Sequence, residues 1–180
     1  MLTELDILRD ITGKLEKLGI QYMLTGSLAM SYYVEPRMTR DIDLVVEILP
    51  GMIDHIEKIL NPDYYLSIDS IKDAVENEFM FNLIHNESSI KVDCIIRKSE
   101  GYRKEEFDRR KRVKLANFNI YIVSVEDLII SKMFWIKESA SEIQKKDVKN
   151  LLSSKHDEKY LLNWIEKLKL SQIFETIKNE

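Results

Sequence analysis

The chain has 180 residues, of which 44% are hydrophobic, and 31 aspartates and glutamates against 27 lysines and arginines give a net charge of −4. This composition suits a sizeable apolar core and excludes a disordered chain. The acidic balance excludes a protein that coats nucleic acid through bulk charge, so any RNA contact must use a local patch. A single cysteine, Cys94, excludes an internal disulfide and a cysteine-rich zinc site.

The sequence also bears on where the chain works. No apolar run approaches the roughly 20 residues that cross a bilayer, and no signal-peptide pattern is present. We therefore expect a cytoplasmic protein without a membrane partner.

The first half of the chain reads as alternating helices and strands. Thr3 and Asp6 are typical of a helix cap, and apolar residues at helical spacing then run to Gly19. The pattern next predicts a strand at 21–25, a helix from Ser27 to Tyr33, a strand at 41–47 and an amphipathic helix that begins at Pro50. It then predicts a strand at 64–68, a short helix at 70–75, and strands at 78–85 and 89–97.

The second half begins with a basic stretch, residues 102–114, centred on 109–112. This stretch is either a solvated helix face or connector, or a contact for RNA or a nucleotide-bearing substrate. A last strand is predicted at 119–123. Ser124 and Asp127 are then typical of a capping box, and the chain is helical to its end. The tail, 156–180, packs back on the domain or joins a partner helix.

Two carboxylates stand two residues apart at the head of an apolar strand. On an extended strand, Asp41 and Asp43 point to one face while Ile42 and Leu44 point into the core. Adjacent carboxylates repel each other unless a cation lies between them. Oxygen ligands suit Mg²⁺, which completes its coordination with water and substrate phosphates. The pattern therefore indicates phosphoryl or nucleotidyl chemistry.

A third carboxylate, Asp93, interrupts the apolar strand at 89–97. If this strand lies beside the one with Asp41 and Asp43, three carboxylates converge and can hold two metal ions. The alternative is that Asp93 lies at an exposed edge or pairs with Lys91.

Gly26 and Ser27 lie between the first strand and the helix that follows it. Glycine permits a sharp turn and a close approach of backbone N–H groups to a phosphate, and a helix N-terminus favours anions. A Gly-Ser pair is also often only a turn with an N-cap serine.

These motifs, in residues 22–30 and 36–44, resemble those of the nucleotidyltransferase superfamily, which has the DNA polymerase beta-like fold. The motif Arg-x-Thr-x-Asp-Ile-Asp-Leu is most similar to the corresponding motif of the minimal nucleotidyltransferases and the AbiEii-type toxins. The resemblance implies an α/β (α+β) fold in which a small mixed sheet carries helices. Residues 1–123 would form the catalytic core, and residues 124–180 a helical C-terminal region packed on it.

The resemblance also implies roles for the acidic residues. Asp41 and Asp43 would hold the Mg²⁺ or Mn²⁺ ion that carries the β- and γ-phosphates of a nucleoside triphosphate, and would share a second ion with Asp93. Asp93 would be the general base.

The nucleotide-binding residues would include Gly26, Ser27 and Thr39. Arg37 and Arg40 would also contact the nucleotide, but they are at least as well explained as solvated surface residues. Lys132 ends a Ser-x-Glu-Asp-Leu-Ile-x-x-Lys motif similar to one in the relatives, so it would bind triphosphate. The alternative is a stem packed on the core with its ammonium reaching outward.

Asp147 lies on a later helix similar to one in the relatives, and we interpret it as a structural partner of Lys132 or Lys145. An arginine is common just before this aspartate in the relatives, whereas Gln-Lys-Lys stands at 144–146 here. This departure weakens the assignment to the toxin branch.

Two functions follow from this reading. The first is a metal-dependent enzyme that moves a nucleoside monophosphate to a hydroxyl on tRNA or other RNA, on protein or on a small molecule. The second is a catalytically idle nucleotide- or partner-binding module, such as a toxin-antitoxin component. An antitoxin-like partner and a homodimer are both compatible with the helical tail.

Overall fold

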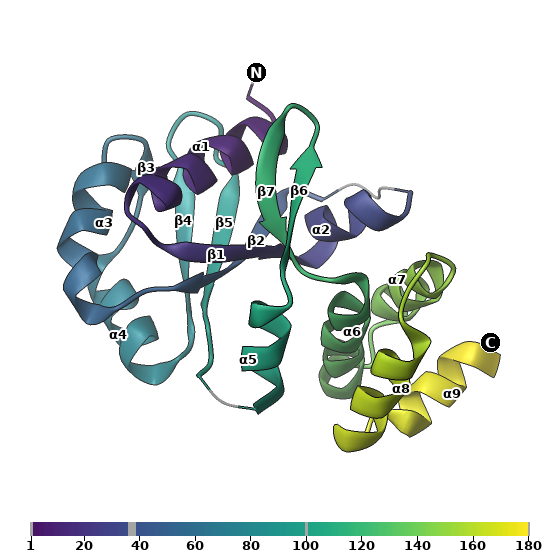
Figure 1. Ribbon diagram of the computed structural model, residues 1–180. Coiled ribbons are helices and arrows are strands. Elements are labelled where there is room, and N and C mark those ends of the chain that lie inside the picture. Colours follow the sequence, from purple (N-terminus) through teal and green to yellow (C-terminus); the bar gives the residue numbers. More distant parts are fainter. Residues whose placement is uncertain (1, 36–38, 100, 180) are drawn as a thin grey trace.

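The computed structural model describes residues 2–35, 39–99 and 101–179 (Figure 1). Within them the strands are β1 (Gln21–Thr25), β2 (Asp41–Glu47), β3 (Tyr64–Tyr65), β4 (Met80–His85), β5 (Lys91–Ile96), β6 (Lys111–Leu115) and β7 (Phe118–Ile122). The helices are α1 (Glu4–Lys17), α2 (Gly26–Tyr33), α3 (Ile53–Leu60), α4 (Ile68–Asn77), α5 (Gly101–Asp108), α6 (Val125–Ser139), α7 (Glu142–Leu152), α8 (Glu158–Lys167) and α9 (Ser171–Asn179), and a 3-10 turn at Pro50–Met52 precedes α3.

The strands form one mixed sheet in the order β3-β4-β5-β2-β1-β7-β6. β2 lies between β1, to which it is antiparallel, and β5, to which it is parallel. Along β2, Ile42, Leu44 and Val46 are buried on one face, whereas Asp41 and Asp43 lie on the other. The expected mixed α/β fold is therefore confirmed, with alternation of period two dividing the core face from an open face.

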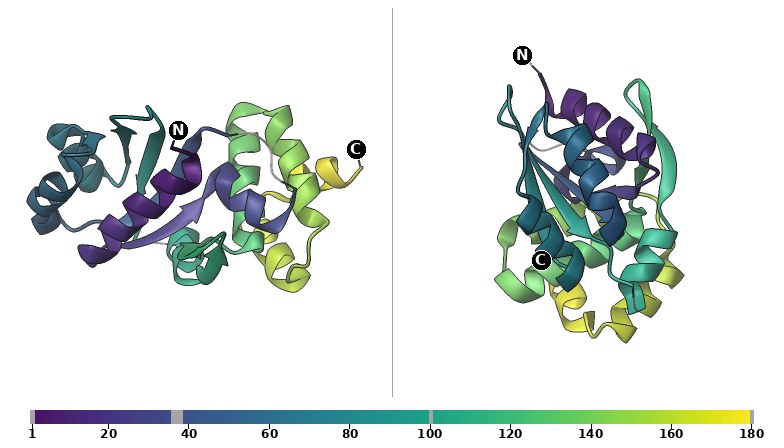
Figure 2. Two further views of the ribbon diagram at one scale, coloured as in Figure 1. Left: turned by 90° about the horizontal axis from the view of Figure 1, so that it is seen from above. Right: turned by 90° about the vertical axis from the view of Figure 1, so that its left-hand side faces the viewer.

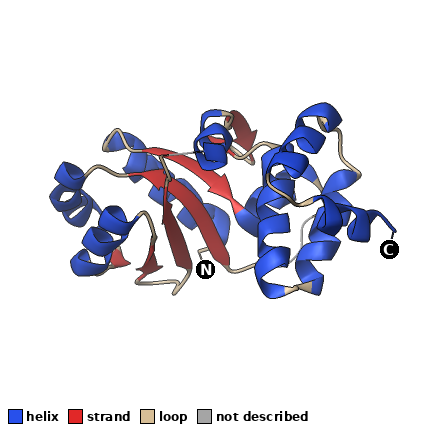
Figure 3. Ribbon diagram, turned by 90° about the horizontal axis from the view of Figure 1, so that it is seen from below, coloured by secondary structure: helices blue, strands red, loops and turns tan. Residues whose placement is uncertain are grey.

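The core face of the sheet is covered by helices from the first half of the chain. Thr3 and Asp6 form a reciprocal capping box at the start of α1, as predicted. α1 packs on β1 and β2 through an apolar stripe that includes Leu8, Ile11 and Leu15, and α4 packs on β4. α3 and α4 lie at one end of the molecule, and the helices α6 to α9 gather at the other (Figures 1 and 3).

The C-terminal helices pack on one another and on α6. The apolar side chains of the tail, Leu161, Ile165, Leu170, Phe174 and Ile177, are all buried. Of the two predicted arrangements, the structure shows the tail packed back on its own chain, where the yellow helix α9 lies against the green helices of the C-terminal half (Figure 2). In the part of the chain that the structure describes, no helix combines the length and apolar character needed to cross a bilayer.

The prediction for the basic stretch 102–114 is wrong in part. Its first half is the helix α5, but Lys111–Leu115 is a strand, β6, which pairs with β7 across a tight turn. β6 is the edge strand of the sheet, where charged side chains such as Lys111 and Arg112 remain in solvent and discourage pairing with another chain. The charges that indicated a helix face or a connector therefore belong to an exposed strand edge.

Smaller differences concern element ends. α4 spans Ile68–Asn77, longer than the predicted 70–75, because Ser67 caps its first turn. The next strand begins at Met80 rather than at 78, since Glu78 adopts a left-handed conformation (φ 48°) that ends α4.

Candidate functional site

Asp43 and Asp93 lie directly opposite each other on the parallel strands β2 and β5. Asp41 lies opposite Lys91 in the same register. The structure thus brings all three predicted carboxylates to one open face of the sheet. This follows from the parallel pairing of two strands that are about fifty residues apart in the chain, which the local sequence pattern alone does not fix.

The Asp43 carboxylate is in an unfavourable place for a negative charge. Burial, followed by the charges of Asp93 and Asp41, raises the pKa of Asp43 to about 6. Asp93 is buried as well, and its Oδ1 has no hydrogen-bond partner among the described residues. A buried hydrogen-bond acceptor without a partner is uncommon in folded proteins, so a cation or a hydrogen-bond donor bound at this face would satisfy Asp93 Oδ1.

Lys91 partly neutralises these carboxylates. Its Nζ lies 2.9 Å from Asp93 Oδ2 and 3.9 Å from Asp41 Oδ1. The hydrogen bond to Asp93 is the main cause that raises the pKa of Lys91. The alternative pairing of Asp93 with Lys91 is therefore present in the structure. Among the described residues, no three histidine, cysteine, aspartate or glutamate side chains are arranged to hold a metal ion.

Gly26 joins β1 directly to α2 and lies against Asp43. Its φ is +67°, and a Cβ built there would be 1.9 Å from Asp43 Oδ2. Glycine is needed at this position both for the backbone conformation and for the space that the carboxylate fills. Thr25, the N-cap of α2, makes no side-chain hydrogen bond to the first turn of that helix.

Three further residues that were predicted to bind nucleotide precede β2 in the sequence. Arg37 lies outside the described residues. Thr39 is half-buried, and its Oγ1 donates to the backbone oxygen of Asp41 at 3.5 Å. Arg40 is exposed at the start of β2.

Lys132 is buried, with an exposed fraction of 3%. Its Nζ donates to Asp147 Oδ2 at 2.7 Å and to Gln144 Oε1 at 3.0 Å. Asp147 is thus the partner of Lys132, and Gln144, at the position where the sequence departs from the relatives, joins the same contact. The positive charge of Lys132 also lowers the pKa of Asp43, although burial outweighs it.

A cavity of about 580 Å³ connects these groups. Gly26, Ser27, Asp43 and Lys132 line one part of it, and the lining also includes the half-buried Phe134 and two further aromatic side chains, Phe79 and Trp135. Both are largely exposed, at 65% and 61%. The sequence interpretation missed them. The spacing of Trp135 three residues after Lys132 on one helix was a usable sign for one of the two.

The cavity wall also holds a polar cluster that the sequence did not indicate. Arg103 Nη1 donates to Glu106 Oε2 at 2.7 Å and to Ser131 Oγ at 2.6 Å. Glu106 is buried, and that burial raises its pKa against the opposing effects of Arg103 and Ser131. The cluster joins α5 to α6 beside the cavity.

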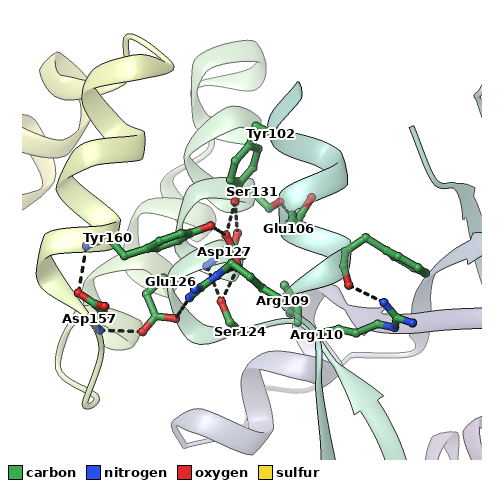
Figure 4. A network of polar contacts seen from close by, with 12 residues as sticks. Tyr102, Glu106, Arg109, Arg110, Ser124, Glu126, Asp127, Ser131, Asp157 and Tyr160 are labelled. Carbon is green, nitrogen blue, oxygen red and sulfur yellow. Dashed lines mark hydrogen bonds and ion pairs between the residues drawn. The ribbon is translucent and has the colours of Figure 1, made fainter. Parts of the chain in front are cut away.

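The basic residues 109–112 do not form a free patch. Arg109 Nε donates to Asp127 Oδ2 at 3.2 Å, and its guanidinium lies 3.6 Å from the centre of the Tyr160 ring (Figure 4). Arg110 Nη1 donates to the backbone oxygen of Phe107 at 2.8 Å. Lys111 and Arg112 are exposed on β6. Half of the cluster is therefore used inside the molecule.

Asp127 is the centre of that internal network (Figure 4). It is fully buried and accepts hydrogen bonds from Ser124 Oγ and from the hydroxyls of Tyr102 and Tyr160, besides the contact with Arg109. The network joins α5, the start of α6, and α8, and so fixes the helix that carries Lys132 and Trp135.

Comparison with known proteins gives structural neighbours only. No family model matches the chain, and no curated protein matches it in sequence. The lincomycin-bound lincosamide antibiotic adenylyltransferase LnuA is similar with a TM-score of 0.59 at 18% identity, over 84% of this chain and 98% of LnuA.

Two other solved structures agree. The antibiotic-resistance factor ANT(2'')-Ia has a TM-score of 0.58 at 13% identity, over 96% of each chain. A nucleotidyltransferase-like protein from Paracoccidioides brasiliensis has a TM-score of 0.55 at 16% identity, over 83% of this chain and 74% of that one. The chain therefore has the fold of the nucleotidyltransferase superfamily.

Proposed function

We propose that this chain is a metal-dependent nucleotidyltransferase that moves a nucleoside monophosphate from a nucleoside triphosphate to an acceptor hydroxyl and releases pyrophosphate. The observation that carries the proposal is the row formed by Asp43 and Asp93 on neighbouring strands beside the Gly26 turn. A binding site for phosphate and a site for a divalent cation then share one edge of a cavity.

The residues fit a hard cation such as Mg²⁺ or Mn²⁺. The donors are carboxylate oxygens, burial and then the charges of Asp93 and Asp41 raise the pKa of Asp43, and the buried Asp93 Oδ1 has no hydrogen-bond partner among the described residues. Asp41, Asp43 and Asp93 are not grouped as a three-ligand site in the described structure, so their side chains would have to turn toward the metal to hold it. The metal, when bound, would neutralise phosphate charge and make the acceptor hydroxyl easier to ionise.

The residues of the site would also have roles besides metal binding. Asp93 would accept the proton of the acceptor hydroxyl as general base. The N–H groups of Gly26 and Ser27 would bind phosphate oxygens, with Lys132 supplying a positive charge from α6. Thr39 and Arg40, which directly precede β2, would contact the phosphates, and Arg37 is proposed for the same role from the sequence alone.

The acceptor class is supported by the neighbours. LnuA was solved with lincomycin, and ANT(2'')-Ia was also solved in complex with adenylyl-2''-tobramycin. Both bound compounds are small molecules. We therefore propose a small-molecule acceptor before RNA or protein.

One observation favours the alternative of an idle binding module. Lys91 already pairs with Asp93 Oδ2, and a lysine ammonium there could replace the cation permanently. In an active enzyme, Asp93 must exchange Lys91 for the metal. Mg²⁺ should therefore raise the unfolding temperature of the native chain and should not raise that of the Asp43→Asn variant.

The decisive experiment measures transfer of α-³²P label from the four nucleoside triphosphates into RNA, protein and small-molecule fractions of a cell extract. We expect label with the native chain and with Asp69→Asn, a control at an exposed acid on α4, but none with Asp43→Asn. Equal labelling by native and Asp43→Asn proteins would exclude the proposed site. Triphosphate binding with no label in any fraction would support the binding module.

A further inference from the structure

The strongest unassigned feature is the aromatic end of the cavity. Phe79 lies directly before β4 and Trp135 lies on α6, and both line the same cavity. Resting on the proposed function, we infer that Phe79 and Trp135 hold the base of the donor nucleotide, so that the cavity is the nucleoside site and the acceptor enters elsewhere.

An apolar row of side chains lies next to the carboxylates on the same face of the sheet and lines the cavity. On the same face, the next cross-strand row is Val45, Ile95 and Met80, which are paired in register across β2, β5 and β4. Residues two apart on a strand are separated by about 7 Å, so this apolar row lies one step beyond Asp43 and Asp93. Phe79 follows directly beyond Met80. A nucleoside whose phosphate lies at the carboxylates can thus extend over an apolar floor toward the aromatic pair.

The direction of attack separates the nucleoside from the acceptor. In phosphoryl transfer the attacking and leaving oxygens are roughly in line, so the acceptor approaches opposite the leaving pyrophosphate. The proposed phosphate-binding groups, Gly26, Ser27 and Lys132, all line this cavity. The acceptor must therefore come from the other side of the carboxylate row, where Asp41 and Lys91 face solvent.

The chemistry of the far wall suits a base. Aromatic faces stack on any nucleobase, because every base has a π-face. Arg103 uses Nη1 for Glu106 and Ser131, and among the described residues no hydrogen bond is made by its other two nitrogens. Those nitrogens remain able to donate to ring nitrogens or carbonyl oxygens of a base. The Arg103 side chain is 37% exposed, which leaves it accessible from the cavity.

The test compares ligands with and without a base. Affinities for the four nucleoside triphosphates and for inorganic tripolyphosphate are measured by calorimetry with Mg²⁺ for the native chain and the Phe79→Ala and Trp135→Ala variants. We expect each variant to bind the triphosphates roughly 5- to 150-fold more weakly, the range that stacking on one side chain supplies. Tripolyphosphate affinity should stay within about twofold, because the phosphate-binding groups are unchanged.

Leu49→Ala is the matched control, since Leu49 is also largely exposed, at 59%, but does not line the cavity. A second readout uses fluorescence, because the chain has two tryptophans. In a Trp164→Phe variant, Trp135 is the only indole, and its emission should change with a nucleoside triphosphate but not with tripolyphosphate.

The outcomes separate this inference from the proposed function. Unchanged triphosphate affinity in both alanine variants, or equal weakening of both ligands, overturns the base site and leaves nucleotidyl transfer in place. A rise in KM for the acceptor with unchanged nucleotide affinity would assign the aromatic pair to the acceptor and also overturns the inference. If the native chain binds neither ligand, the proposed function fails as well.

Discussion

Gly26 lies where the chain leaves β1, and its missing side chain leaves room for the Asp43 carboxylate. Gly26→Ala should destabilise the fold by about 1–2 kcal/mol from the left-handed backbone alone, and should abolish label transfer by displacing Asp43. Gly13→Ala is the control, because Gly13 lies in α1 with open space around it. That change should stabilise by about 0.5–1 kcal/mol. Urea unfolding measures both, and an active, stable Gly26→Ala variant would contradict the account.

Asp43 should make the stability of the metal-free chain depend on pH. Its pKa rises from 3.8 to about 6 on folding, so between these values the folded chain binds more protons than the unfolded chain. The buried carboxylate therefore costs nothing below about pH 4 and its full penalty, on the order of 3 kcal/mol, above about pH 6.

Asp43→Asn removes this penalty while it removes the proposed metal ligand. In EDTA, the variant should exceed the native chain in free energy of unfolding by about 1–3 kcal/mol at pH 7.5, and the difference should shrink toward pH 4.5. Urea titrations at several pH values measure it. A difference that stays constant with pH would show that Asp43 titrates normally in the folded chain.

At the scale of elements, the network around Asp127 joins α5, α6 and α8 (Figure 4). Arg109→Ala removes a cation from a buried carboxylate and a stacking partner from Tyr160, so we expect a loss of about 2–4 kcal/mol. Arg112→Ala, at an exposed position three residues on, should change stability by less than about 0.5 kcal/mol. Similar effects of the two changes in urea unfolding would mean that the basic cluster is a solvated patch.

The sequence was informative where a pattern is local. Alternation in 41–47 predicted the β2 strand and the face of its carboxylates, and the caps at Thr3 and Ser124 predicted the starts of α1 and α6. The charges of Lys111 and Arg112 concealed β6, because the same residues suit a helix face and an edge strand.

The cavity depends on packing between distant segments and was not predictable in the same way. Phe79 and Trp135 are more than fifty residues apart, and no local periodicity relates them. Lys132 shows the intermediate case. The sequence left Lys132 and Lys145 as alternative partners of Asp147, and only the packing of α7 on α6 decides that the ion pair with Lys132 forms. Whether Lys132 also binds phosphate stays a prediction.

At the scale of the whole molecule, we propose that residues 1–123 are the catalytic core and 124–180 a helical region that shares one core with it. Buried residues of both parts belong to one continuous apolar cluster, and the Tyr102 hydroxyl of the first part donates to Asp127 Oδ1 of the second at 2.9 Å. A cavity lined from both parts would need them to stay together during function.

The two parts should therefore unfold together. Both tryptophans, Trp135 and Trp164, lie in the helical region, so fluorescence reports that region while far-UV circular dichroism reports the whole chain. The two urea transitions should superimpose. Phe174→Ala, at a buried position of α9, should shift both by about 3–5 kcal/mol, whereas Leu162→Ala, at an exposed position of α8, should shift neither appreciably. A fluorescence transition that precedes the dichroism transition would mean that the helical region unfolds independently, and the cavity could then open by its detachment.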